Sequence, residues 1–217
     1  RVSTLNLNGI RSAAGKGVAE SQPLPRAGEA MPDTRVLRSE VIHLTMRPGG
    51  RDIDKVATEG PGTVDFLPNR PGQPKRFMKG DRLLFIYGPD SRIQHFDGFN
   101  ASTRTEHPEQ PGAPPMLTQS KEIAANFDPK TGELALLAQR FDFHYQEGAR
   151  QATAALATLD PATDVITLDG AARVWDPSGS AAADRLVMHQ KSGDFVADGR
   201  AATMRMPDQK GSSTAML

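Results

Sequence analysis

The sequence of 217 residues predicts an all-β chain built from repeated antiparallel hairpins. Short runs of alternating or β-branched residues fill most of the chain, and Gly, Pro, Asp and Asn interrupt them at intervals. Few segments show the three-and-four spacing of apolar residues that marks an amphipathic helix. Because a single hairpin cannot bury an apolar face alone, the repeats are expected to stack into one elongated sheet.

A tight turn that follows an apolar stretch and leads into an outgoing strand recurs along the chain. The turns are 88–92, 128–132, 160–164 and 190–194, with looser upstream copies at 41–66 and 10–20. The copies repeat at roughly 29 to 45 residues, a spacing typical of stacked supersecondary units. A small residue such as Gly98 or Gly170 follows each turn, which predicts a bulge or bend within the outgoing strand.

The segment 149–159 is rich in alanine, which favours a helix, whereas its place in the repeat favours a strand. Three further stretches rich in proline, 22–33, 67–75 and 106–115, predict loops. We expect a partial first hairpin and linker over 1–34, one β domain over 35–207, and a tail or the start of a further repeat over 208–217. The chain begins with Arg1 and no signal peptide, which predicts a trimmed piece of a longer protein.

Apolar side chains fall on one side of the predicted sheet, whereas Thr45, Gln139 and Arg200 fall on the other. A closed core and an open groove that accepts a lipid need the same alternation, so the pattern leaves both possible. In the second case the groove would be lined by Ile42, Leu44, Leu83, Phe85, Phe96, Leu134, Leu136, Ile166, Leu168, Leu186, Met188 and Phe195.

Composition excludes several classes of function. The chain has 26 basic and 26 acidic residues, so it lacks the basic surplus of nucleic-acid binders, and it has no cysteine for disulfides or thiolate metal sites. No apolar run approaches the roughly 20 residues of a membrane-spanning helix. The sequence contains no phosphate-binding loop and no dinucleotide-binding motif, so it predicts no cofactor. The histidines show no metal-ligand spacing; they are His43, His95, His107, His144 and His189.

One short segment suggests an enzyme. Residues 4–13 resemble the opening of exonuclease III-type phosphodiesterases, in which the Asn that matches Asn8 helps to bind a divalent metal. The later Gly-Asp-x-Asn and Ser-Asp-His phrases of those enzymes are absent from this chain. We therefore predict no catalytic residue and interpret the segment as a first hairpin strand.

The tail carries a second resemblance. Residues 183–201, with an Ala-Asp-x-apolar strand, a turn and a Phe-Val-Ala-Asp-Gly phrase, resemble the repeat of the LptA/OstA family, and 153–174, 93–102 and 10–19 carry fainter copies. The resemblance implies a non-enzymatic periplasmic protein with a partly open β-jellyroll whose groove holds acyl chains. It also implies lipopolysaccharide or another lipid as ligand, Lpt-type partners, and head-to-tail oligomers joined through edge strands. A structural filament subunit that assembles through such edges is the alternative function.

Two further sets of residues were candidates for binding. The aromatic residues Trp175, Tyr145, Phe141 and Phe143 suit either a buried core patch or a platform for carbohydrate, and the first is the more common. Basic side chains at the mouth of a lipid groove would pair with lipid phosphates. For that role we consider Arg82, Arg92 and Arg185.

Overall fold

The computed structural model describes residues 12–21, 33–106, 112–189 and 194–205. Asn8, His107, the turn residues 190–193 and the tail lie outside these ranges. The strands are β1 (Ser12–Ser21), β2 (Thr34–Met46), β3 (Ile53–Thr58), β4 (Gly62–Leu67), β5 (Lys75–Gly80), β6 (Arg82–Tyr87), β7 (Ile93–Glu106), β8 (Met116–Phe127), β9 (Leu134–Glu147), β10 (Arg150–Asp160), β11 (Val165–Asp176), β12 (Gly179–His189), β13 (Phe195–Asp198) and β14 (Ala202–Arg205).

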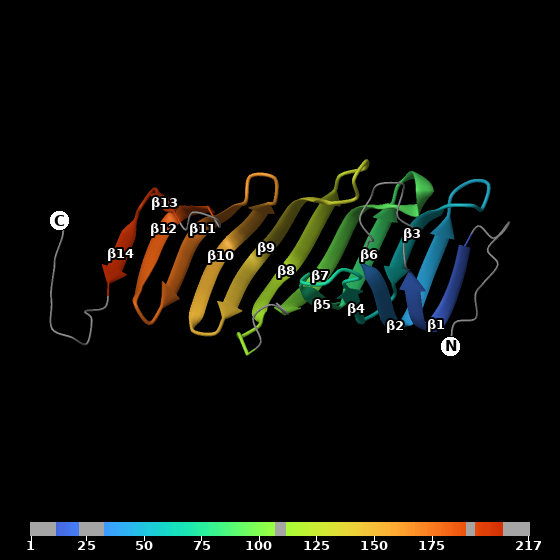
Figure 1. Cartoon of the computed structure of the whole chain (residues 1–217), viewed down its shortest axis with the longest axis horizontal. Coiled ribbons are helices and arrows are strands. Elements are labelled where there is room, and N and C mark those ends of the chain that lie inside the picture. Colours follow the sequence, from blue (N-terminus) through green and yellow to red (C-terminus); the bar gives the residue numbers. More distant parts are fainter. Residues whose placement is uncertain (1–11, 22–32, 107–111, 190–193, 206–217) are drawn as a thin grey trace.

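The strands form one antiparallel sheet and follow one another along an elongated molecule, from β1 near one end to β14 near the other (Figure 1). This confirms the predicted all-β fold of repeated hairpins. In the described part of the chain the single helix is the 3-10 turn η1 (Pro89–Ser91), which is far too short to cross a membrane. The division of the chain at residues 35 and 208 stays a prediction.

The predicted turns 128–132 and 160–164 join paired strands, and an aspartate in each satisfies backbone N–H groups of the turn. Asp128 Oδ1 accepts hydrogen bonds of 2.8 Å from the backbone N–H groups of Lys130 and Thr131. Asp160 Oδ1 does the same for Ala162 at 2.9 Å. These bonds hold the tight turns of the β8–β9 and β10–β11 hairpins.

The alanine-rich segment is strand β10. It pairs with β9 along one edge and with β11 along the other, so both of its rows of backbone groups enter ladders. Its alternate alanines Ala152 and Ala154 are buried. Tertiary pairing therefore overrides the helical preference of alanine.

Six strands close into a ring in the N-terminal half. One edge of β7 pairs first with β6 and then with β5, while its other edge pairs with β8 along most of its length. β2 divides in the same way between β4 and β3. Because β3 pairs with β6 and β4 with β5, the order β2–β3–β6–β7–β5–β4 returns to β2. The sheet is thus split into two layers between β2 and β7.

The long strands are bent near their middles. Backbone φ is positive at Asn100 (43°) in β7, at Phe141 (62°) and Asp142 (56°) in β9, and at Gly170 (77°) and Ala171 (50°) in β11. The register between neighbouring strands shifts beside the bends in β9 and β11, as expected for bulges. The bend predicted at Gly170 is confirmed.

Gly98 serves a different purpose from a bend. It pairs with Leu83 on one side and Ile123 on the other, and a Cβ atom added to it would lie 2.7 Å from Ile123 Cγ2. The bend of β7 comes two residues later, at Asn100. Gly98 is therefore needed for the close approach of its neighbours rather than for backbone freedom.

Two apolar clusters lie on what we call the inner face of the sheet. The first cluster is enclosed largely by the ring and consists of Leu37, Ile42, Val56, Val64, Met78, Leu83, Phe85, Tyr87, Ile93, Phe96, Ala101, Ile123 and Ala125. The second cluster lies on β9 to β12 and consists of Phe143, Ala152, Ala154, Ala157, Leu168, Ala172, Ala183 and Leu186. Leu168 and Ala172 stand on either side of the bend in β11, so both halves of that strand contribute to one core.

The expected positions of Leu136 and Gln139 are wrong. Asn126 pairs with Leu136 but the next residue of β8 pairs with Leu134, so β9 carries one extra residue. This bulge reverses the alternation that follows it. Leu134 and Leu137 pack against the first cluster, Leu136 is 38% exposed, and Gln139 is only 5% exposed.

Candidate ligand site on the inner face

The residues predicted to line a groove do not share one environment. Six of them are buried, in two separate clusters: Ile42, Leu83, Phe85 and Phe96 belong to the first cluster, and Leu168 and Leu186 to the second. Leu44, Leu134, Ile166 and Met188 are half-buried. Leu136 and Phe195 are exposed. The inner face is therefore divided, and its two halves need separate descriptions.

The half inside the ring is a filled core. Leu83 is fully buried and Val64 is 1% exposed, and the rings of Phe85 and Phe96 lie 4.8 Å apart between centroids. A Cβ added at Gly80 would lie 3.0 Å from Leu83 Cδ2, so the packing leaves no spare volume there. In this half the alternation reflects an ordinary core.

The half formed by β9 to β12 is packed differently. We call Ala152, Ala154, Ala172 and Ala183 the alanine wall, since these buried members of the second cluster present only a methyl group. Larger side chains pack against the cluster but stay half-buried, among them Ile166, Val174 and Met188. Apolar surface is thus left partly accessible on the inner face of this half.

At the C-terminal end of the sheet, one edge of β12 is divided between two short strands. The edge of β12 that faces away from β11 pairs with β13 through residues 185–188 and with β14 through residues 179–182. This division matches the one that opens the ring at β2 and β7. In the ring, β3 and β4 each pair with a further strand, β6 and β5, whereas among the described strands β13 and β14 pair with β12 alone.

A polar seam separates the two clusters. Thr103 and Thr118 share a hydrogen bond of 2.7 Å, and Thr118 Oγ1 donates to Gln139 Oε1 at 3.0 Å. Ser120 Oγ lies 3.4 Å from the same oxygen and donates to the Glu122 carbonyl at 2.8 Å. Sequence analysis missed this group because Gln139 was expected on the opposite face. The signal was the pair of hydroxyl residues, Thr118 and Ser120, at inward positions of β8.

The aromatic candidates do not form one cluster. Phe143 is 5% exposed in the second cluster, and the half-buried Tyr145 packs against it and donates to Glu147 Oε2 at 2.7 Å. Burial raises the pKa of the Tyr145 hydroxyl, and Glu147 raises it further. Phe141 is 53% exposed beside the bend, so its expected burial is wrong. Trp175 lies under the Arg173 guanidinium, 5.1 Å from its ring centroid.

Two of the three arginines considered for the groove mouth lie elsewhere. Arg82 precedes the fully buried Leu83 in β6, so it points to the outer face, where its guanidinium stacks 4.3 Å above the Phe99 ring. Arg185 likewise precedes the buried Leu186 and is exposed. Arg92 is near the strand ends, and its Nη1 donates to the Lys130 carbonyl at 3.3 Å.

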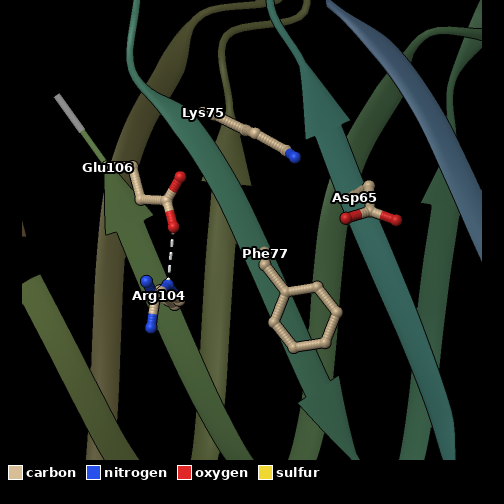
Figure 2. Close-up of a pocket in the computed structure, with 5 residues that line it drawn as sticks. All are labelled: Asp65, Lys75, Phe77, Arg104 and Glu106. Atoms are coloured by element: carbon tan, nitrogen blue, oxygen red, sulfur yellow. Dashed lines mark hydrogen bonds and ion pairs between the residues drawn. The ribbon is translucent and has the colours of Figure 1, made fainter. Parts of the chain in front are cut away.

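Two hollows are lined mainly by polar and charged residues and by glycines. Figure 2 shows one of about 180 Å³, in which the Phe77 ring is flanked by charged side chains. The lining residues are Asp65, Lys75, Phe77, Arg104 and Glu106. Arg104 Nε donates to Glu106 Oε1 at 2.7 Å. A wider hollow of about 650 Å³ is lined mainly by polar residues and glycines of β2, β4, β5 and β7.

The histidines and acids do not gather into a metal centre in the described ranges. His43 Nε2 lies 3.0 Å from Glu59 Oε2, and His95 contacts Asp97 at 2.9 Å and Asn126 at 2.6 Å. These are pairs of exposed or half-exposed side chains on the sheet surface. Among the described residues, no three such side chains are close enough together to hold a metal ion.

The fold and the inner face define an elongated antiparallel β protein, closed and filled at one end and with partly accessible apolar surface toward the other. No protein-family model matches the chain, and no curated protein matches its sequence. Among solved structures, LptH, the LptA homologous periplasmic component of the lipopolysaccharide transport device from Pseudomonas aeruginosa, aligns with a TM-score of 0.47 at 9% identity. The alignment covers 61% of this chain and 95% of LptH. At this level of similarity, function has to come from the residues themselves.

Proposed function

We propose that the chain is a non-enzymatic module that binds the acyl chain of a lipid on the inner face of β9 to β12. The observation that carries this proposal is that Ile166 and Met188 pack on the second cluster yet remain half-buried. Apolar surface of this kind gains about 0.8 kcal/mol for each methylene that covers it. The alanine wall favours a slim ligand, because a methyl group projects little from the sheet.

The resemblance of the repeat to the LptA/OstA family extends the proposal. It makes lipopolysaccharide the candidate ligand, Lpt-type proteins the candidate partners, and the periplasm the candidate location. The twelve predicted lining residues are narrowed by the packing described above. Ile166, Met188 and the edge residue Phe195 are the best placed to meet a ligand, whereas the residues inside the ring face a filled core.

Binding can be tested with purified, delipidated protein and a fluorescent fatty acid, with native mass spectrometry as a second readout. Met188→Glu places a charge on the inner face and is expected to weaken binding about tenfold or more. Val187→Glu is the matched control, because Val187 is the neighbouring half-buried residue on the opposite face. If the wild-type protein binds no lipid in either assay, the lipid function is wrong while the fold stands.

Assembly through sheet edges is the second candidate function. In the described part of the chain β1 pairs with β2 alone, and β13 and β14 pair with β12 alone. Val196 is 58% exposed on β13 and Met204 is 65% exposed on β14. Unpaired strand edges with exposed apolar residues are templates for adding another strand.

Analytical ultracentrifugation over a range of concentrations separates the two functions. Val196→Lys is expected to reduce self-association and to leave fatty-acid binding unchanged. Association that persists when Phe195 and Ile166 are both replaced by Asp, in a protein that binds no lipid, would favour a filament subunit. A protein that stays monomeric at all concentrations would exclude the assembly function.

A further inference from the structure

Two arginines from opposite ends of β2 both interact with Tyr87, Arg47 through a hydrogen bond to its backbone and Arg35 through its charge. Arg35 lies near the start of the strand and Arg47 directly follows its end. The Arg47 guanidinium donates through Nη2 to the carbonyl oxygen of Tyr87, at the end of β6. The charge of Arg35 acts on the hydroxyl of the same Tyr87. A straight strand of this length would span about 40 Å, so only the folding of β2 between its two layers brings both arginines to Tyr87.

Both guanidinium groups are incompletely paired. The Nε atoms of Arg35 and Arg47 are buried and have no hydrogen-bond partner in the described part of the chain. Arg47 keeps a distant carboxylate, Asp54, whose Oδ1 lies 3.7 Å from Nη2. The Arg35 side chain makes neither a hydrogen bond nor an ion pair with any described residue. Both arginines are half-buried as whole residues, but buried N–H groups normally have partners, so the two unpaired Nε–H groups require an explanation.

Arg35 is poorly solvated and has no ion-pair partner among the described residues. Burial lowers the pKa of Arg35 and raises the pKa of Tyr87, so the arginine is poorly solvated and the tyrosine keeps its hydroxyl proton. Asp33 is the nearby negative charge that acts on Arg35, but it forms no ion pair with it. Met46, which precedes Arg47, and Ile93, which pairs with Tyr87, are both buried.

We propose that Arg35, together with Arg47 and the Tyr87 hydroxyl, binds a phosphate or phosphate-monoester group at this end of the ring. A guanidinium presents a planar fork of N–H donors that matches two oxygens of such an anion, and the free Nε–H of Arg35 supplies part of that fork. The phosphate has two possible sources, free phosphate and the headgroup of an amphiphile. The headgroup form rests on the proposed lipid function, whereas the anion site itself does not.

The site can be tested with inorganic phosphate, dodecyl phosphate and, as a neutral chain, dodecyl maltoside. Arg35→Met keeps the length of the side chain and removes its charge, and Arg82→Met is the control on the outer face. Calorimetric titration is expected to show dodecyl phosphate binding that weakens about tenfold or more in Arg35→Met and is unchanged in Arg82→Met. Phosphate is expected to raise the Tm of the wild type and of Arg82→Met only.

A structural role for Arg35 would give a different pattern. If the arginine serves a ligand, Arg35→Met without ligand should melt at the same or a higher temperature, because a poorly solvated charge with an unpaired Nε–H group is removed. A lower Tm in that variant, with no phosphate effect in the wild type, would overturn the proposal, as would equal binding of dodecyl phosphate to the wild type and Arg35→Met.

The three probes also separate the two sources and the two proposals. Equal affinity for phosphate and dodecyl phosphate supports a site for free anion, and a clear preference for dodecyl phosphate supports a lipid headgroup. Phosphate binding that depends on Arg35, in a protein that does not bind the fluorescent fatty acid, supports the anion site and contradicts the lipid function. Fatty-acid binding without any effect of Arg35→Met on phosphate binding supports the lipid function and contradicts the anion site.

Discussion

Replacement of Gly98 by Ala is expected to destabilise the ring. Gly98 lies in register between Leu83, which is fully buried, and Ile123, which is 2% exposed. The new Cβ would meet Ile123 Cγ2 at 2.7 Å and Phe96 Cζ at 3.2 Å, and neither neighbour can move into solvent. Overpacking of this kind costs about 1–3 kcal/mol. The loss of chain entropy in the unfolded state offsets about 0.4–1 kcal/mol of that cost.

The measurement is the free energy of unfolding in urea, with Tm as a second readout. Each kcal/mol is expected to lower Tm by about 2–4 °C in a chain of this size. Gly60→Ala is the matched control, because an added Cβ at Gly60 has no heavy atom within 4 Å. The control carries the same entropic gain, so the difference between the variants isolates the clash. Equal stability of the two variants would refute the close packing of β6, β7 and β8 around Gly98.

Three further changes test other parts of the fold. Leu186→Ala removes a fully buried side chain and is expected to cost about 2–5 kcal/mol in urea unfolding, whereas Leu136→Ala, at a 38% exposed position, should cost far less; equal costs would contradict the bulge in β9. Gly170→Ala should lower Tm, since φ is 77° there and the new Cβ would lie 2.7 Å from Ala155 Cβ. Hydrogen bonds from Arg200 lower the pKa of Asp184. The ionised carboxylate therefore stabilises the fold at pH values above the unfolded-state pKa of about 3.9. This stabilisation is lost as pH falls through the lower folded-state pKa. Asp184→Asn should therefore be less stable at pH 7, and its deficit should shrink below about pH 4 in urea titrations at several pH values.

The faces occupied by Leu136 and Gln139 show where the alternation of apolar and polar residues stops predicting burial. Alternation predicts a face only while the pairing register is regular. One extra residue in β9, opposite the end of β8, exchanges the two faces for the rest of that half-strand. Nothing within β9 marks the extra residue, because the bulge is a property of the pair of strands. The polar seam around Gln139 was hidden for the same reason.

The candidate anion site depended even more on tertiary structure. Arg35 and Arg47 are ordinary surface residues by their place in the sequence, at the two ends of a predicted strand. The divided edges of β2 and β7 fold the sheet into two layers and bring both arginines to Tyr87. A sequence signal did exist, since Arg35 stands two residues before the buried Leu37 and so shares its inward face.

The sequence by itself determined the fold class, the positions of the turns and the apolar side of most strands. Turn residues act over a few neighbours and alternation acts within one strand, so both are legible along the chain. Only the tertiary structure decided that 149–159 is a strand, that the inner face is divided into a filled ring and a more accessible half, and that two arginines with unpaired Nε–H groups both interact with Tyr87. These outcomes depend on which edges pair and in which register, and that choice is made between segments far apart in the sequence.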